Sequence, residues 1–425
     1  MTESAKPILT SVVTPDKVVA RATNEPESLA SLAMPSRRLA RIHSIEDFRE
    51  SARRALPRMV FDFIDGGAGN ESTVRDNRAA FERVRLVPSG PVDVSARTPR
   101  IGLFGRQQAL PIVIGPIGLA SAFWPDGEIA LARAAARHGI PFVLSNGTSI
   151  PTGKVMSATK GRKWFQLYVP PDERLLDTWL DQIDREGYDV LEVTVDTAVP
   201  GRRLRDVRNG FSMPLRWTPA KVLDVALHPR WMIDMLRSGA PKPVMWEEAA
   251  ASRPAATVSE RNLSAISPRL DWRMVERLRA RWPHALVIKG LADPRQVSRA
   301  LSAGVDGLVV SNHGGRQLDG AVAALDVLPE IVDAVGGQIP VLVDSGVRSG
   351  SDILKALALG ASAVQIGRAA VYALATAGEA GVDRALSLLR EELDQAMALC
   401  GVRTCSEATR EHVRYAPWPS AERRA

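Results

Sequence analysis

Cysteines are scarce in this sequence, and long apolar runs are missing altogether. The 425 residues include only Cys400 and Cys405, which cannot supply a disulfide framework, so we expect a reducing compartment. No stretch approaches the roughly 18 apolar residues that a membrane-spanning helix requires. The first residues also lack the charged start and apolar core of a secretory signal. These absences predict a cytoplasmic protein without a transmembrane segment.

Positive charge is in excess, but it is not concentrated in one place. The formal net charge is +7, and the arginines are spread along the chain. The sequence contains no RNA- or DNA-binding motif and no basic aromatic stripe, so we do not expect a nucleic-acid partner. Hydrophobic residues make up 45% of the chain and charged residues 24%. These proportions are typical of a globular protein.

Eight short apolar runs recur through the centre of the chain, and a segment of helical length follows each one. The runs cover residues 110–115, 141–145, 164–169, 190–196, 285–290, 307–312, 340–346 and 363–368. Nearly all-apolar runs are typical of parallel strands buried on both faces of a sheet. Eight such units predict an α/β protein with a closed (β/α)8 TIM barrel, not an open doubly wound sheet.

The remaining segments flank or interrupt this barrel. Residues 1–40 show no sustained period and predict a disordered N-terminal tail. Ser44 and Asp47 resemble a capping box, which begins an N-terminal helical extension. We therefore assign the barrel domain to 41–412 and a C-terminal tail to 413–425. A long insertion follows the fourth strand, over about 205–270, because the next run begins only at Ala285.

Charged residues and a histidine follow the predicted strands at the barrel end that carries catalytic residues in this fold. Asp196 follows the fourth strand, Lys289 ends the fifth, His313 and Arg316 follow the sixth, and Asp344 ends the seventh. Any one of them alone could be structural. Several such groups at one rim would be costly in a mere scaffold, so their joint placement predicts an active site.

The last two strands carry glycines and arginines in a pattern that predicts a phosphate site. Gly346, Arg348 and Gly350 follow the seventh strand, and Gly367 and Arg368 follow the eighth. Glycines let backbone N–H groups approach phosphate oxygens, and arginine binds them through two parallel hydrogen bonds. Ordinary turns with surface arginines would be the alternative. We expect no metal site.

Long motifs in this chain resemble one family of enzymes. The motifs are LPRMVFDFIDGGAGNE (56–71), WFQLYV (164–169), SNHGGRQLD (311–319) and VDSGVRSGSDILKALALGA (343–361). They are similar to the FMN-dependent α-hydroxy acid oxidases and dehydrogenases, and the resemblance runs from about 42 to about 411. Residues 115–135, 200–211 and 227–231 are similar to the mandelate-oxidising members in particular.

The resemblance implies FMN as cofactor and assigns four catalytic residues. His313 would be the base that removes a proton from the substrate, a task suited to an imidazole near neutral pH. Asp196 would stabilise the charged imidazole. Tyr168 would face the substrate hydroxyl or carboxylate. Lys289 would lie by the flavin N1–C2 edge, where negative charge develops on reduction.

The same resemblance implies the binding residues. Arg316 and Arg203 would clamp the substrate carboxylate, because guanidinium groups match its geometry. The expected cofactor contacts, besides Lys289, are Pro116, Ile117, Gly118, Ser145, Gln166, Thr194, Ser311, Asp344, Gly346, Arg348, Gly367 and Arg368.

Three departures from the family pattern bear on the substrate. Phe63 stands where many members have a carboxylate-binding tyrosine, and Ile117 replaces a frequent threonine beside the flavin. Gly147 stands where some members have a bulky tryptophan, which leaves room unless another side chain such as Phe123 fills it. We therefore expect oxidation of a mandelate-like 2-hydroxy acid to the 2-oxo acid, and the resemblance implies the (S) enantiomer.

The electron acceptor is left open by the sequence. We favour a quinone, with oxygen and release of hydrogen peroxide as the alternative. A flavin- or phosphate-binding barrel without catalysis is a remote third reading, opposed by the presence of His313, Asp196, Arg316 and Lys289 together. The resemblance suggests a homotetramer.

The insertion contributes a second open question. Residues about 214–250 combine apolar and cationic side chains in a pattern typical of a peripheral membrane contact, which would lie on the inner face of the cell membrane. The rival interpretations are additional core helices, a subunit contact, or a lid over the active site. The apolar residues are Trp217, Val222, Leu223, Val225, Leu227, Trp231, Met232, Ile233, Met235, Leu236 and Trp246, and the cations are Lys221, Arg230, Arg237 and Lys242.

Overall fold

The computed structural model describes residues 39–210, 217–246 and 266–416. The chain divides into two compact units, Met1–Ala33 and Met34–Ala425, and the described residues all belong to the second. The predicted tail over 1–40 therefore lies outside the described residues, apart from the first two residues of the 3-10 helix Leu39–Arg41. Parts of the predicted insertion, 211–216 and 247–265, lie outside them as well.

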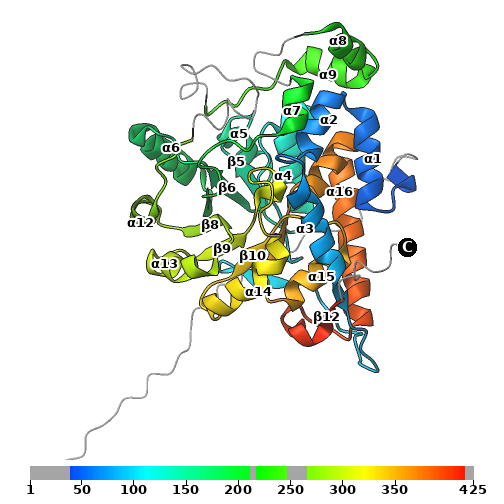
Figure 1. The fold of residues 1–425 in the computed structure, drawn as a ribbon, viewed down its shortest axis with the longest axis vertical. Coiled ribbons are helices and arrows are strands. Elements are labelled where there is room, and N and C mark those ends of the chain that lie inside the picture. Colours follow the sequence, from blue (N-terminus) through cyan, green and yellow to red (C-terminus); the bar gives the residue numbers. More distant parts are fainter. Residues whose placement is uncertain (1–38, 211–216, 247–265, 417–425) are drawn as a thin grey trace, which may run out of the picture. The chain divides into compact units, whose positions relative to one another are not determined.

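Eight parallel strands close into a barrel, which confirms the predicted fold class (Figure 1). Each predicted run overlaps one strand, and β6 and β8 extend one residue beyond their runs. The runs are apolar because these strands are covered on both faces. The strands are β4 (Ile112–Ile114), β5 (Phe142–Ser145), β6 (Lys163–Leu167), β7 (Val190–Thr194), β8 (Ala285–Leu291), β9 (Gly307–Val310), β10 (Val341–Val343) and β11 (Ala363–Ile366). They neighbour one another in the order β10-β11-β4-β5-β6-β7-β8-β9.

An apolar layer fills the N-terminal half of the barrel interior. It takes one side chain from every strand, and these are Val113, Val143, Trp164, Val190, Val287, Val309, Leu342 and Ala363. The hairpin of β2 (Ile101–Leu103) and β3 (Arg106–Gln108) closes this end, with the ring of Phe104 5.4 Å from that of Trp164. A functional cavity can therefore open only at the C-terminal end.

Helices surround the barrel and extend it at the N-terminus. The extension comprises α1 (Ile45–Ala55), α2 (Arg58–Asp65) and α3 (Ser72–Arg83), and the predicted capping box of Ser44 and Asp47 begins α1. The buried side chains of α1 pack on the last helix, α16. The other helices are α4 (Gly127–Arg137), α5 (Thr152–Ser157), α6 (Glu173–Glu186), α12 (Trp272–Arg281), α13 (Val297–Ser302), α14 (Ala324–Val335), α15 (Gly350–Ala358) and α16 (Arg368–Leu399). Further 3-10 helices are η3 (Ala120–Ala122), η4 (Pro294–Gln296), η5 (His313–Gly315), η6 (Cys405–Glu407) and η7 (Arg410–His412).

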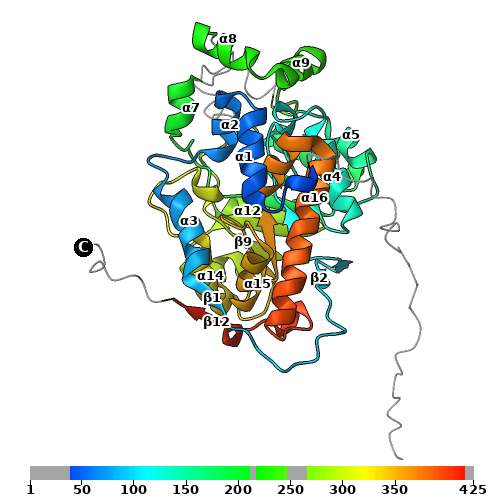
Figure 2. The same cartoon turned by 90° about the vertical axis from the view of Figure 1, so that its right-hand side faces the viewer.

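The described part of the insertion forms three short helices, α7 (Leu204–Asn209), α8 (Pro219–Ala226) and α9 (Pro229–Ser238). Figures 1 and 2 both show α8 and α9 beyond α2 and α7. The Trp231 indole N–H on α9 donates to the carbonyl oxygen of Ala122, 2.9 Å away, which joins the pair to the barrel domain. Within the described chain, no helix is long and apolar enough to cross a membrane.

The predicted C-terminal tail begins too early. Residues Val413–Tyr415 form β12, which pairs antiparallel with β1 (Val84–Leu86) beside the N-terminal extension. The pairing partner is more than 300 residues away in the sequence (Val84↔Tyr415), and a three-residue edge strand carries too little pattern to be recognised without it.

Candidate active site

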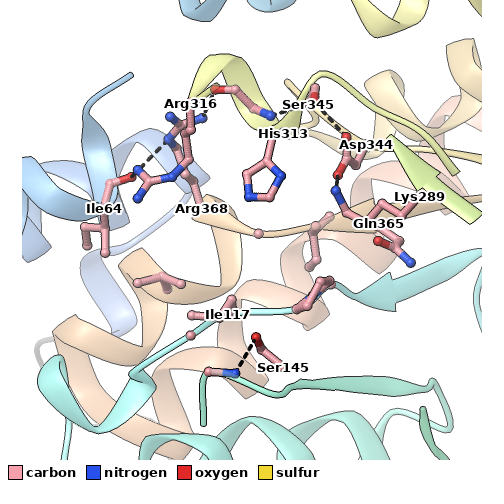
Figure 3. Close-up of a pocket in the computed structure, with 18 of the residues that line it drawn as sticks. Ile64, Ile117, Ser145, Lys289, His313, Arg316, Asp344, Ser345, Gln365 and Arg368 are labelled. Carbon is pink, nitrogen blue, oxygen red and sulfur yellow. Dashed lines mark hydrogen bonds and ion pairs between the residues drawn. The ribbon is translucent and has the colours of Figure 1, made fainter. Parts of the chain in front are cut away.

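A cavity opens at the C-terminal end of the barrel, and most of the predicted site residues line it (Figure 3). Those that line it are Phe63, Pro116, Ile117, Gly118, Ser145, Gly147, Tyr168, Arg203, Lys289, His313, Arg316, Asp344, Gly346, Arg348, Gly367 and Arg368. The other four predicted residues lie behind this lining. Asp196, Gln166 and Ser311 bond to lining residues, and Thr194 accepts a hydrogen bond from Gln166. The structure thus brings together residues from all parts of the barrel domain.

His313 projects into the cavity between a carboxylate and a phenol. Its Nδ1 lies 3.0 Å from Asp196 Oδ1, and its Nε2 lies 3.4 Å from the Tyr168 hydroxyl. Because an ionised carboxylate can only accept a hydrogen bond, Nδ1 carries the proton and Nε2 keeps its lone pair. Figure 3 shows the imidazole pointing from one wall toward the wall that carries Ile117 and Ser145.

Burial favours the neutral form of this imidazole, which can accept a proton. Desolvation lowers the pKa of His313 below its ordinary value, against the opposing effect of Asp196. Burial would raise the pKa of Asp196, but the nearby His313 and Lys289 lower it, so the carboxylate stays ionised. Burial, followed by Asp196, raises the pKa of Tyr168 to about 12, so its hydroxyl keeps its proton. The arrangement offers one proton acceptor and one donor to the same point.

Two arginines face the same cavity, Arg203 buried and Arg316 partly buried, with little negative charge to balance them. Burial, and then the charge of Arg203, lowers the pKa of Arg316 to about 9. The Arg203 guanidinium lies 4.0 Å from Asp206. Nη1 of Arg316 donates to the carbonyl oxygens of Phe63 and Gly66, at 2.7 and 3.0 Å, whereas Nη2 has no partner among the described residues. An anionic ligand would relieve this excess of buried positive charge.

Lys289 forms a second charged cluster deeper in the barrel. Its Nζ donates to Ser311 Oγ at 2.9 Å and lies 3.1 Å from Asp344 Oδ2. Burial disfavours the ammonium form, but Asp344 and Asp196 hold the pKa of Lys289 above its ordinary value. Gly290 comes next with φ +101°, and a Cβ there would lie 2.6 Å from Asp196 Cγ. Glycine at this position therefore allows the cation and Asp196 to approach each other.

The residues at the far end of the cavity fit the phosphate of a mononucleotide. Gly367 is the N-cap of α16, and a Cβ on it would meet no atom within 4 Å, so the helix N-terminus is open to the cavity. Helix N-termini with free N–H groups favour anions. Arg348 and Arg368 line the same region. Gly118 and Gly147 also line the cavity, and a Cβ on Gly118 would meet the Gly147 oxygen at 3.5 Å, an ordinary contact distance. The absence of side chains at both positions leaves space in the cavity.

Among the lining residues that the sequence did not predict, Trp246 and Gln365 bear most on the chemistry of the cavity. Trp246 counted there as part of the exposed insertion, but it is 2% exposed and its ring lies 5.9 Å from that of Tyr168 at 81°. A backbone bond from Val244 N to Thr148 O carries this part of the insertion back to the barrel. No local signal could have shown this return. Gln365 was visible as a polar residue within an apolar run, a signal that was available but not used.

Aromatic rings bound the space beside Gly147. The Phe63 and Phe123 rings are stacked with centroids 6.3 Å apart, and Tyr168 and Trp246 line the same cavity. The Arg316 guanidinium carbon lies 5.3 Å from the centre of the Phe63 ring. Phe123 and Trp246 therefore line the same cavity as Gly147, and these rings add an apolar surface to a cavity that also holds the two arginines.

Comparison with known proteins identifies close relatives of this chain. The model of a family described as FMN-dependent dehydrogenase matches residues 52–415. The chain is 42% identical over 362 residues to (S)-mandelate dehydrogenase of Pseudomonas putida, which covers 85% of this chain and 91% of that protein. It is 40% identical over 372 residues to L-lactate dehydrogenase of Yersinia pestis (strain Pestoides F), covering 87% and 97% respectively.

Solved structures point to the same group. A structure of the monotopic membrane protein (S)-mandelate dehydrogenase matches with a TM-score of 0.83 and 39% identity, over 88% of this chain and all of that one. A mandelate oxidase structure with (S)-4-hydroxymandelic acid matches with a TM-score of 0.78 and 38% identity, over 88% of this chain and 99% of that one.

Proposed function

The chain belongs to the family of FMN-dependent dehydrogenases, and on that premise we propose that it oxidises an (S)-2-hydroxy acid with an aromatic side chain to the 2-oxo acid. The observation that carries the proposal is the placement of His313, bonded to Asp196 and next to the Tyr168 hydroxyl, in the cavity that Arg316 and Arg203 also line. The arginines can bind a substrate carboxylate, and the imidazole is a base within reach of a substrate held there. When bound, FMN supplies the acceptor for the electrons that leave the substrate.

The chain's own residues then have distinct tasks. Arg316 and Arg203 orient the carboxylate, which leaves the adjacent substrate carbon and its hydroxyl near His313. Nε2 of His313 takes a proton from the substrate, and Asp196, bonded to Nδ1, stabilises the imidazolium that results. The Tyr168 hydroxyl, which keeps its proton, donates a hydrogen bond to the substrate oxygen. Lys289 lies where it can stabilise negative charge on the reduced cofactor.

An aromatic substrate is favoured by the walls of the cavity. Phe63, Phe123 and Trp246 enclose apolar space next to the carboxylate site. Burying a phenyl ring there would contribute on the order of 2 kcal/mol at about 25 cal/mol per Å2, or roughly a thirtyfold preference. A small aliphatic acid would leave that space to water.

The decisive experiment is anaerobic reduction of the FMN-loaded protein by a panel of (S)- and (R)-2-hydroxy acids, followed through flavin absorbance. We expect (S)-mandelate or a ring-substituted relative to bleach the flavin with a higher specificity constant than glycolate or lactate. A protein that binds no FMN would defeat the whole proposal. Faster reduction by glycolate would defeat only the aromatic preference.

We further infer a peripheral membrane contact through α8 and α9, with a quinone as electron acceptor. Leu223, Leu227 and Leu236 are 63%, 70% and 78% exposed, and Arg237 beside them is exposed too. Exposed leucines with nearby cations are typical of a helix pair that lies in the membrane interface. The similar mandelate dehydrogenase is named a monotopic membrane protein. Rapid reoxidation by oxygen with release of peroxide, and no binding to anionic vesicles, would favour an oxidase instead.

A further inference from the structure

Strand β7 carries a carboxylate inside the barrel that the proposed reaction does not use. Glu192 lies between Val190 and Thr194 on the inward face of the strand and is 0% exposed. It is paired in register with Gln166 of β6 and Val287 of β8. Val190 belongs to the apolar layer below, and Gln166 bonds to Ser145 in the cavity lining above. Glu192 therefore lies between the apolar layer and the cavity at the C-terminal end of the barrel.

The partner of Glu192 reaches it from the opposite side of the barrel. Nε2 of Gln365, on β11, donates a short hydrogen bond to Glu192 Oε2. The other oxygens of this pair, Glu192 Oε1 and Gln365 Oε1, are buried without a hydrogen-bond partner among the described residues. Gln365 itself lines the cavity, and Figure 3 shows it beside Lys289. Gln365 therefore connects the floor of the cavity to the buried Glu192.

The charges that face Glu192 do not compensate it. Among the described residues, Lys289 on β8 is the cation with the largest effect on its pKa, while Asp344 after β10 and Asp196 after β7 are anionic. Lys289 is already engaged by Asp344 at 3.1 Å, and no ion pair joins Glu192 to any described residue. Burial without a cation of its own favours the neutral acid. Burial accordingly raises the pKa of Glu192 to about 7.

We propose that Glu192 is a positioning residue that holds a proton beneath the cofactor. Its protonation state then controls how strongly Lys289 stabilises negative charge on the reduced flavin. When Glu192 is neutral, the positive potential of Lys289 acts on the cofactor without opposition. When Glu192 is a carboxylate, its negative charge offsets part of that potential. When the cofactor becomes more negative on reduction, an ionised Glu192 takes one proton from solvent and returns to the acid. No electron passes through this residue, so the electron balance of the reaction is unchanged.

The test is the flavin midpoint potential as a function of pH, measured with a chemical reductant and indicator dyes so that no substrate is needed. The inference rests on FMN binding, so FMN-loaded protein is compared with Glu192→Gln, which mimics the neutral acid. Glu392→Gln is the control, because Glu392 is another acid whose pKa burial raises, although it is only partly buried, lies on α16 and accepts from Gly350 N.

We expect the potentials of wild type and Glu192→Gln to coincide near pH 5.5 and to separate above about pH 7, with the variant more positive. The Glu392→Gln curve should run parallel to wild type throughout. Curves of wild type and Glu192→Gln that stay parallel over the whole range would overturn the inference. Should the variant not fold, the wild-type curve alone decides, because a slope that does not steepen between about pH 6 and 8 also overturns it. Either negative result leaves turnover of hydroxy acids untouched, so it is distinguishable from failure of the proposed function.

Discussion

At the scale of single residues, the position of His313 depends on an unusual backbone conformation. Its φ is +57°, a value that residues other than glycine rarely adopt. The backbone N–H of His313 donates to Ser311 Oγ at 3.0 Å, and the Asn312 side chain accepts from Gly315 N. The surrounding turn therefore holds the conformation that directs the imidazole into the cavity, as strained backbone at functional sites commonly does.

We predict that His313→Gln retains FMN but reduces it with substrate about 10²- to 10⁴-fold more slowly, the usual contribution of a general base. Cofactor affinity should hold because the glycines and arginines at the phosphate end are unchanged. Stopped-flow flavin reduction and an FMN titration of the apoprotein measure the two quantities. A variant that reduces its flavin at the wild-type rate would remove His313 from the mechanism.

The pH dependence of flavin reduction should follow the same imidazole. Burial holds the pKa of His313 below its ordinary value, so the base remains neutral through pH 7 and loses activity only as the pH falls through its lowered pKa. We therefore expect the rate of anaerobic reduction to be flat between about pH 7 and 8 and to decline in acid below the ordinary histidine value of about 6.5. A decline that begins above pH 7 would contradict a neutral resting imidazole.

Arg316 has both a ligand-binding and a structural task, and the two can be separated. Arg316→Lys keeps the charge but loses the planar fork, so substrate affinity should fall about 10- to 100-fold, in line with about 1.5–3 kcal/mol for a charged hydrogen bond. Its bonds to the carbonyls of Phe63 and Gly66 would also weaken. The binding of a non-reactive carboxylate analogue and of FMN should be titrated separately. Equal losses for both ligands would mean a structural role alone.

At the scale of elements, the described part of the insertion contains two segments with different surroundings. Helices α8 and α9 expose leucines, whereas the returning residues 243–246 bring Trp246 into the cavity. Trp217, at 59% exposure, belongs to the same insertion but not to the cavity. Substitution of these two tryptophans of one segment is therefore expected to have different effects on substrate preference.

Trp246→Ala should lower the specificity constant for (S)-mandelate at least about tenfold more than that for (S)-lactate. The reason is loss of an apolar wall, worth about 1.5–3 kcal/mol for a buried side chain of this kind. Trp217→Ala is the control and should leave the ratio unchanged. Equal effects of Trp246→Ala on both substrates would show that the indole only supports Tyr168.

Exposed leucines on α8 and its C-terminus should decide membrane binding. The double change Leu223→Ser with Leu227→Ser should weaken sedimentation with phosphatidylglycerol vesicles at least about tenfold, because each inserted leucine contributes about 1.5 kcal/mol or more. Leu399→Ser, at a position 62% exposed at the end of α16, serves as control. Identical vesicle binding by all three proteins would favour the reading of α8 and α9 as a subunit contact.

At the scale of the whole barrel domain, the N-terminal extension completes the site. Arg316 and Arg368 both donate to backbone carbonyls in the segment from Phe63 to Gly66, where α2 ends. Ile64 and Phe63 also line the cavity. These bonds join residues about 250 to 300 positions apart in sequence. The barrel and the extension are therefore one functional unit, and the cavity has no complete wall without α2.

The sequence by itself determined the barrel and the chemistry at its rim. A parallel strand covered on both faces must be apolar, so eight such runs could be read directly, and residues that follow a strand must emerge at one end. The sequence alone therefore predicts that these residues lie together. They are His313, Asp196, Lys289 and Arg316.

Only the tertiary structure decided which distant residues meet. Trp246 enters the cavity because its segment returns to the barrel, Gln365 reaches Glu192 across the interior, and the arginines bind carbonyls of α2. None of these contacts leaves a local pattern, because local propensity and periodicity describe an element and its buried face but not its partner. The partner depends on how the whole chain closes around the barrel.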